Sequence, residues 1–352
     1  MALYREWLER TRGAPLVIIF NGDNAKEFDN ALNLFSSHAH QWVDVTIALQ
    51  PLISAKLIEL QPEDVPLLKK VTIDHRYLVP GRPRTVTPAN IRKIISTLAR
   101  IPTLTDLSWG YDSIPLFFYS LKWPNLRKFH AYTCRLKTEE CLVLLDQLPH
   151  VEDIFFGNYI DGHYKTIVTA KNLHSLVLYC SSGSDMRIFN ALILPSLETL
   201  QTCIPRDHTS VEHLIERSGC TLRHLTVNGI HGNLLALLEL KCFCFLYSLR
   251  FTLLPCLTNE VARRLTWDTD TDQSIMFPHL SVIEISNNCD TTDGILSRMI
   301  SSRWKGNRDP HGLKRLVVPR RFIKSGIVQD IDRATLRCLS EQGLDIVEIV
   351  LQ

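Results

Sequence analysis

Paired cysteines are among the side chains of this chain that could hold a metal ion. Cys242 and Cys244 are separated by one residue, whereas zinc sites place two to four residues between paired cysteines. No second pair follows them at a readable spacing. The sequence therefore predicts two alternating cysteines at the edge of a strand or helix, and no zinc site.

The histidines predict no metal site either. His38 and His40 could chelate an ion from one face of a strand, but two polar surface histidines beside Trp42 are the favoured interpretation. His208 and His213 border a helical segment and lack a third ligand at a readable spacing. We expect no metal and no other cofactor.

Motifs and composition exclude several further function classes. No phosphate-binding loop, G-x-G-x-x-G, H-E-x-x-H or G-x-S-x-G pattern occurs, so we expect no enzymatic activity. The 352 residues are 45% hydrophobic and 22% charged, a balance typical of folded proteins, and the net charge is only +2. Such a charge creates no general attraction for nucleic acids or anionic membranes.

Basic residues gather in three places. They occur at 81–84, at 303–315 beginning with Arg303, and at Arg320–Arg321. Binding of nucleic acid would need them on one face with stacking aromatic side chains. We expect solvated loops at these places and no nucleic-acid partner.

The N-terminal residues and the cysteines indicate the cellular compartment. The first ten residues, MALYREWLER, carry charges and lack the apolar centre of a secretory signal. We therefore expect the ten cysteines to be reduced, buried, small hydrophobic residues of a cytoplasmic or nuclear protein. The most apolar stretch, 234–251, is interrupted by Glu239, Lys241 and Arg250, which argues against a membrane span.

One short sequence motif, called the repeated phrase below, recurs along the whole chain. Its pattern is L-x-x-L-x-h, where h is apolar, and the alternation is that of a strand with one buried face. Ten copies are separated by 22 to 34 residues, and three weaker ones precede them. The copies begin at Pro15, Trp42, Leu68, Leu104, Leu126, Val151, Leu173, Leu197, Leu222, Leu246, Leu280, Leu313 and Ile346.

Helical patterns lie between the copies. Residues 88–100, 138–148, 258–267 and 292–304 place apolar side chains at helical spacing. Pro88 stands near the start of the first segment, and Thr138 is the expected capping residue of the second. The repeating unit is therefore a strand, a turn, a helix and a second turn.

This unit is the leucine-rich-repeat signature. Stacked neighbours bury the apolar faces that one unit alone cannot bury. We expect an α/β horseshoe with parallel strands on the concave face and helices on the convex face. An N-terminal helical cap with the first strand would occupy residues 1–40, and irregular repeats, longer after about residue 250, would occupy 41–352.

Alternate positions of each strand should point away from the core and line the concave face. Tyr132, Phe155 and Tyr179 fall in successive repeats, and neighbouring exposed aromatic residues are typical of protein-binding hot spots. An equally weighted alternative is that a helix, tail or loop covers them. The residues predicted to contact a partner are Lys128, His130, Tyr132, Phe155, Tyr179, His224, Asn228 and Arg250.

Three N-terminal stretches carry a family resemblance. They read REWLERTRGAPLVIIF, LFSSHAHQWVDVTIAL and VPLLKKVTI. They resemble the repeat regions of fungal F-box proteins, especially the basidiomycete set, which have a W-L-x-R-S/T-x-x-x-P-L segment followed by an H-x-x-R-W strand. Gln41 stands where that strand usually has Arg. The residues that fit are Trp7, Leu8, Arg10, Thr11, Pro15, Leu16, Trp42 and one of His38 and His40.

The resemblance implies a function without chemistry of its own. Such a chain would be the substrate-recognition part of a cullin–RING ubiquitin ligase, holding a target protein on its concave face as a monomer. Residues 60–68 echo the start of an F-box, but 69–84 continue as a strand and a Pro-rich loop, so no F-box is expected in this chain. Binding of the ligase adaptor would require an F-box upstream. The alternative is a free-standing leucine-rich-repeat protein unrelated to ubiquitination.

Overall fold

The computed structural model describes residues 2–20, 25–48, 51–74, 86–111, 114–180, 185–228, 233–252, 257–267, 276–286, 291–304, 306, 312–319 and 330–349. The basic residues at 81–84 and Arg320–Arg321, together with Cys256 and Cys289, lie outside these ranges. The chain divides into two compact units, Met1–Leu173 (unit 1) and His174–Gln352 (unit 2). The expected boundary near residue 40 stays a prediction.

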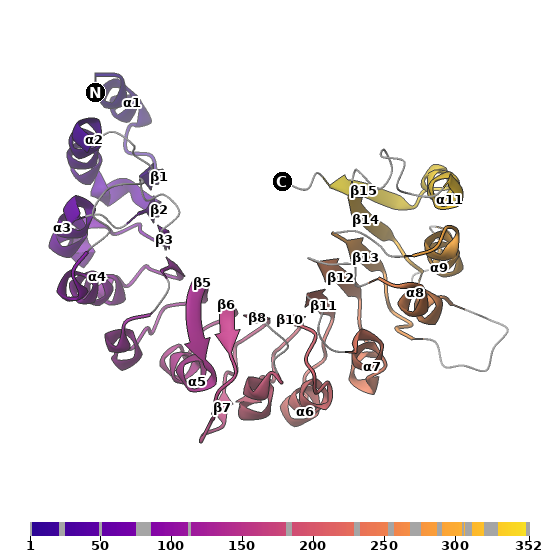
Figure 1. Cartoon of the computed structure of the whole chain (residues 1–352). Helices are drawn as coiled ribbons and strands as arrows, with labels where there is room; N and C mark the ends of the chain where they lie inside the picture. Colours follow the sequence, from indigo (N-terminus) through magenta and orange to yellow (C-terminus); the bar gives the residue numbers. More distant parts are fainter. Residues whose placement is uncertain are drawn as a thin grey trace. The chain divides into compact units, whose positions relative to one another are not determined.

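Unit 1 alternates strands and helices (Figure 1). Its strands are β1 (Leu16–Phe20), β2 (Trp42–Ile47), β3 (Lys70–Asp74), β4 (Asp106–Gly110), β5 (Lys128–Lys137), β6 (Asp153–Ile160) and the short β7 (Val168–Thr169). Its α-helices are α1 (Ala2–Thr11), α2 (Ala25–Ser36), α3 (Pro51–Glu59), α4 (Pro88–Arg100) and α5 (Thr138–Gln147). Short 3₁₀ helices are η1 (Ala39–Gln41), η2 (Pro62–Asp64) and η4 (Leu116–Ser120).

Unit 2 follows the same plan. Its strands are β8 (Ser175–Cys180), the short β9 (Leu192–Ile193), β10 (Thr199–Cys203), β11 (His224–Asn228), β12 (Ser248–Thr252), β13 (Val282–Ile285), β14 (Arg315–Pro319) and β15 (Asp345–Ile349). Its helices are α6 (Thr209–Ser218), α7 (Leu234–Leu238), α8 (Asn259–Leu265), α9 (Ile295–Arg303), α11 (Asp330–Glu341), η5 (Arg187–Ala191) and η6 (Lys241–Phe243).

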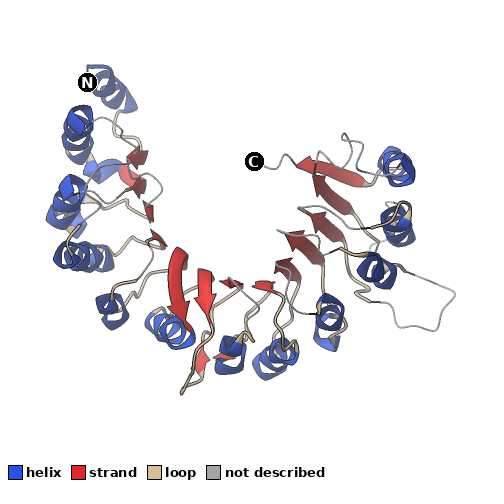
Figure 2. Ribbon diagram, in the orientation of Figure 1, coloured by secondary structure: helices blue, strands red, loops and turns tan. Residues whose placement is uncertain are grey.

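The main sheet contains thirteen parallel strands in sequence order, and the sequence pattern predicted all thirteen. Six of them, β1 to β6, belong to unit 1, and β8, β10 and β11 to β15 belong to unit 2. In each unit the helices lie on one side of the strands (Figure 2). Side chains on the other side therefore form an open face of the sheet.

The alternation of each strand determines which side chains form the core. In β1 the burial alternates, with Leu16, Ile18 and Phe20 buried and Val17 and Ile19 exposed. A parallel strand that is covered by helices on one face buries every second side chain. The two leucines of the repeated phrase thus hold the helices against the sheet.

One copy of the phrase was placed in the wrong phase. The sequence alignment set Ile346 level with Leu313, whereas the structure pairs Ile346 with Leu316. Consequently Asp345, rather than Glu348, lies beside Arg315. Several apolar positions in a row allow more than one phase, and pairing with the neighbouring strand selects one of them.

The helix ends were predicted in part. The helix over 88–100 is confirmed, and the Thr87 side chain accepts a hydrogen bond from the Asn90 N–H at its start. The capping role predicted for Thr138 is wrong. Thr138 lies inside α5, where its buried hydroxyl is 2.8 Å from the Tyr159 hydroxyl and accepts from the Gly162 N–H.

The interpretation of Arg303 as part of a solvated loop is also wrong. Arg303 ends α9 and is 1% exposed, and it donates hydrogen bonds to the carbonyl groups of Leu265, Met276 and Phe277. Burial lowers the pKa of its guanidinium to about 10. The side chain therefore ties the end of one helix to the backbone of preceding segments.

The cysteines divide into three groups. Cys134 and Cys141 are buried, as predicted, whereas Cys244 and Cys338 are exposed, so the prediction is wrong for these two. The half-buried ones are Cys180, Cys203, Cys220 and Cys242. Sequence alternation could not separate these groups because exposed and buried positions both occur beside apolar residues.

Candidate functional site

A row of alternating charges crosses the open face of unit 1. The strand register places one residue each from β2, β3, β4, β5 and β6 side by side. Each of them is the third residue of its repeated phrase, which points away from the helices. The members of this charged row are Asp44, Lys70, Asp106, Lys128 and Asp153.

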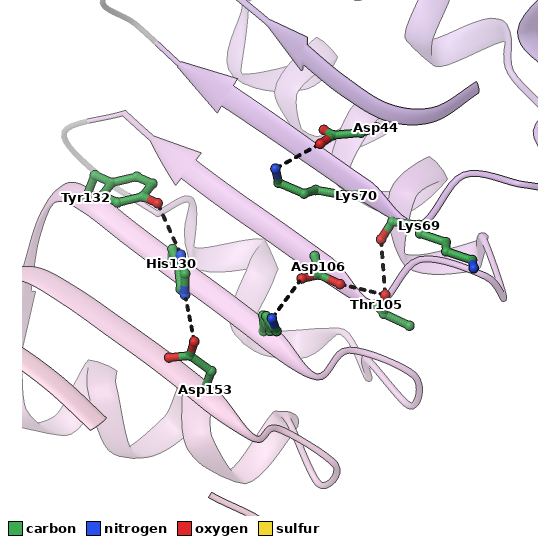
Figure 3. A network of polar contacts seen from close by, with 9 residues as sticks. Asp44, Lys69, Lys70, Thr105, Asp106, His130, Tyr132 and Asp153 are labelled. Carbon is green, nitrogen blue, oxygen red and sulfur yellow. Dashed lines mark hydrogen bonds and ion pairs between the residues drawn. The ribbon is translucent and has the colours of Figure 1, made fainter. Parts of the chain in front are cut away.

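Neighbours in the charged row form ion pairs (Figure 3). The Lys70 ammonium lies 2.8 Å from the Asp44 carboxylate, and this hydrogen bond raises the pKa of Lys70. The Lys128 ammonium lies 3.9 Å from Asp106, whose carboxylate also accepts from the Thr105 hydroxyl. The row therefore holds its side chains in place without a strong net charge.

An aromatic cluster lies beside the charged row. The ring of His130 lies 5.7 Å from that of Tyr132 and 6.0 Å from that of Phe155, and the last two rings are 5.0 Å apart. His130 also contacts the Tyr132 hydroxyl at 3.1 Å and the Asp153 carboxylate at 3.5 Å, as Figure 3 shows. Tyr132 is 43% exposed, so the cluster presents an aromatic surface. The polar contacts of His130 hold its rings in place.

A bulge in the sheet presents Tyr132. The register between β5 and β6 shifts between Ala131 and Arg135, so that three residues of β5 stand opposite one of β6. That one residue is Gly157, and a Cβ atom there would lie 1.9 Å from the Tyr132 carbonyl oxygen. Only glycine permits this approach of the two backbones.

Unit 2 contains a different cluster around Tyr179. The Gln201 side chain donates a hydrogen bond to the Tyr179 hydroxyl. The Asn228 amide approaches the same hydroxyl, although neither of its polar atoms makes a well-formed hydrogen bond. Burial raises the pKa of Tyr179, and the nearby Asn228 and Arg250 partly oppose this shift.

The placement of Asn228 corrects the sequence analysis. Asn228 was predicted to contact a partner, but it is 0% exposed. Tyr179 on β8 reaches Asn228 on β11, and β10 lies between these strands, so the tyrosine side chain spans the intervening strand. An alternating pattern gives the direction of a side chain but not what covers it.

The remaining predicted residues are accessible. Lys128 and Arg250 are exposed, and His130, Phe155, Tyr179 and His224 are half-buried. Arg250 forms an ion pair of 2.9 Å with Glu284, and the His224 ring lies 5.9 Å from that of Tyr247. The structure thus brings together Lys128, His130, Tyr132 and Phe155 in unit 1, and Tyr179, Asn228 and Arg250 in unit 2.

Sequence analysis did not select Asp44, Lys70 or Gly157 for this site. The third position of each phrase alternates in charge along five copies, and this signal could have identified the first two. No local pattern marks Gly157, since its role depends on the neighbouring strand.

The described residues contain no group of three or more side chains suited to hold a metal ion. The Gln41 amide lies between His38 and His40, at 3.3 Å and 3.2 Å from their ring nitrogens.

Among the described helices none is both long and apolar enough to cross a membrane. Comparison with protein-family models and with curated proteins found no match for this chain.

Proposed function

We propose that this chain is a leucine-rich-repeat solenoid that binds a target protein on the open face of its strands. The parallel strands support this fold, and all of them except β6 and β15 are followed by a helix before the next strand of the sheet. Helices are about 10 Å wide, whereas parallel strands are about 4.8 Å apart, so a stack with all helices on one side curves toward its strands. The open face then becomes the concave wall.

The observation that carries the proposal is the aromatic cluster on the open face. Tyr132 is exposed and rests against Phe155 and His130. Tyrosine is enriched at the centres of protein interfaces because its ring buries a large apolar area and its hydroxyl still forms hydrogen bonds. The charged row beside the cluster would supply the polar rim and favour a partner with matching charges.

The ligase role rests on the resemblance to fungal F-box proteins. In this proposal the chain performs no chemistry, and it holds the target near the enzyme that transfers ubiquitin. Proximity alone can contribute a large part of a rate enhancement. Adaptor binding is assigned to an F-box and not to the repeats.

The binding face can be tested by photo-crosslinking. A photoreactive phenylalanine replaces Tyr132 on the open face or Val143 on the outer side of α5, where the side chain is similarly exposed. We expect proteins to be captured selectively from position 132. Equal capture from both positions would contradict the proposal.

A matched pair of variants then measures affinity for a captured protein. Tyr132→Ala should weaken binding by about 10-fold or more, since truncation of a central tyrosine typically costs about 2 kcal/mol. Tyr164→Ala removes a tyrosine of similar exposure, 38%, that lies outside the strands, and should leave affinity unchanged.

The ligase role is tested separately. The chain alone should not bind the ligase adaptor, whereas the same chain fused to an F-box should bind it and promote ubiquitination of the captured protein. Firm adaptor binding by the chain alone would overturn the assignment. Target binding without ubiquitination by the fusion would favour the free-standing scaffold.

A further inference from the structure

Two cysteines meet at the ends of neighbouring strands in unit 2. Cys180 is the last residue of β8, and Cys203 is the last residue of the adjacent β10. The Cys180 N–H donates a hydrogen bond of 3.2 Å to the Cys203 sulfur, and the Cys203 thiol approaches the Cys180 carbonyl oxygen at 3.5 Å.

Regular alternation would point these two side chains to opposite faces, but at the strand ends the Cys203 sulfur turns toward the Cys180 backbone, and these contacts bring the two residues within reach of a covalent bond. β8 and β10 pair in parallel up to Leu178 and Thr202, which places Cys180 one residue beyond the level of Cys203. Adjacent strands about 4.8 Å apart with a rise of about 3.3 Å per residue give a diagonal separation of about 5.8 Å between Cα atoms. Disulfides form across Cα separations of roughly 4.4–6.8 Å.

We propose that Cys180 and Cys203 are a redox modification site that forms an intramolecular disulfide on reaction with a peroxide. Both side chains are half-buried, so a small oxidant can reach them. The site lies beside Tyr179, whose ring crosses the level of Cys203 to reach Asn228. Oxidation would therefore fix the two strand ends next to this tyrosine.

The chemistry balances with hydrogen peroxide as the oxidant. The Cys203 thiolate attacks one peroxide oxygen, the O–O bond breaks and a sulfenic acid forms as hydroxide leaves and takes up a proton. The Cys180 thiolate then attacks this sulfur, the S–O bond breaks and a second water leaves. Two thiols are oxidised, and the peroxide is reduced to two molecules of water.

The order of attack follows from the surroundings of the two thiols. The hydrogen bond from the Cys180 side chain lowers the pKa of the Cys203 thiol to about 7, burial opposes this shift, and the backbone N–H of Cys180 adds to it. The thiolate is the reactive form of cysteine. Cys203 is therefore the attacking residue and Cys180 is the resolving one.

Peptide mapping tests this inference on the whole chain. Trypsin cleaves after Lys171, Arg187 and Arg206, so that Cys180 and Cys203 fall in adjacent peptides, 172–187 and 188–206, which a disulfide holds together once the bond after Arg187 is cleaved. After brief treatment with hydrogen peroxide and alkylation of the remaining thiols, we expect the joined pair, two hydrogen atoms lighter than the separate peptides. A reductant should release both.

Single variants and an internal control sharpen the result. In Cys180→Ser, Cys203 should remain as a sulfenic acid or its further oxidation products, and no joined pair should form. The exposed Cys338 should be oxidised without such a partner in the same sample. Alkylation of Cys203 should fall at least 10-fold after peroxide treatment of the original chain. Separate alkylated peptides 172–187 and 188–206, or a disulfide to another cysteine, would overturn the inference whatever the open face binds.

Discussion

Two sets of charged side chains, one in each unit, have opposite roles. In unit 1, Lys70 and Lys128 lie on the open face, about half exposed, and pair with aspartates of neighbouring strands. In unit 2, Arg303 and Asp332 are 1% and 3% exposed and bind backbone groups. Exposed ion pairs contribute little to stability, whereas a buried charge that satisfies backbone groups is costly to remove. The first arrangement leaves charges available for recognition, and the second maintains the fold.

The largest effect should come from Arg303→Met in unit 2. The change leaves the carbonyl groups of Leu265, Met276 and Phe277 without their donor. Each buried group left without a partner costs about 1 kcal/mol or more, so we expect a loss of about 3 kcal/mol. Hydrogen–deuterium exchange should become faster in α8 and α9 and stay unchanged in unit 1.

Arg298 is the matched control for this prediction. It lies on the same helix but is exposed, so that Arg298→Met should change stability by less than about 0.5 kcal/mol. Equal effects of the two variants would show that burial of Arg303 does not matter.

Asp332→Ala should have an intermediate effect. The Asp332 carboxylate accepts hydrogen bonds from the N–H groups of Gly294 and Ser297 and so caps α9 from the neighbouring α11. Removal of a helix N-cap typically costs about 1 kcal/mol, and burial raises this to about 2 kcal/mol. Urea unfolding and exchange at the start of α9 measure the loss.

The exposed Asp330 at the start of α11 provides the comparison. Asp330→Ala should cost less than half as much, since it removes only a favourable interaction with the helix dipole. If both variants are equally stable, the cap across the two helices is not significant.

Lys70→Met should have the smallest effect, about 0.5 kcal/mol at low salt and less at 1 M NaCl. The hydrogen bond to Asp44 raises the pKa of Lys70 above its ordinary value of 10.5. The contribution of the pair is therefore fully present below pH 10.5 and is lost as the pH rises through the raised pKa. Stability measured against pH and salt, with the variant as reference, checks this prediction.

Lys93→Met is the control, because this lysine is exposed on α4 rather than on the sheet. We expect it to be neutral at every salt concentration. A loss above about 2 kcal/mol for Lys70→Met would remove the distinction between the exposed charged row and the buried charges.

The strands could be predicted from the sequence because each one depends only on residues a few positions apart. Alternation of apolar and polar residues, as in Leu126 to Ala131, requires only that one face of a short ribbon be buried. Repetition of that phrase then predicts that neighbouring copies pair in parallel. The last copy failed because its neighbouring apolar residues fit two phases.

The site was predictable to a lesser degree. The aromatic cluster of His130, Tyr132 and Phe155 followed from alternate positions of two neighbouring phrases. The burial of Asn228 did not, since the neighbours of this side chain include a tyrosine on the second strand away.

The sequence by itself determined which residues form strands and which faces are apolar, because both depend on neighbours a few positions away. Only the tertiary structure decided that Arg303 binds three carbonyl groups, that Gly157 admits a bulge and that Cys180 meets Cys203. These contacts join residues 20 or more positions apart, and small shifts of one strand against the next create or remove them.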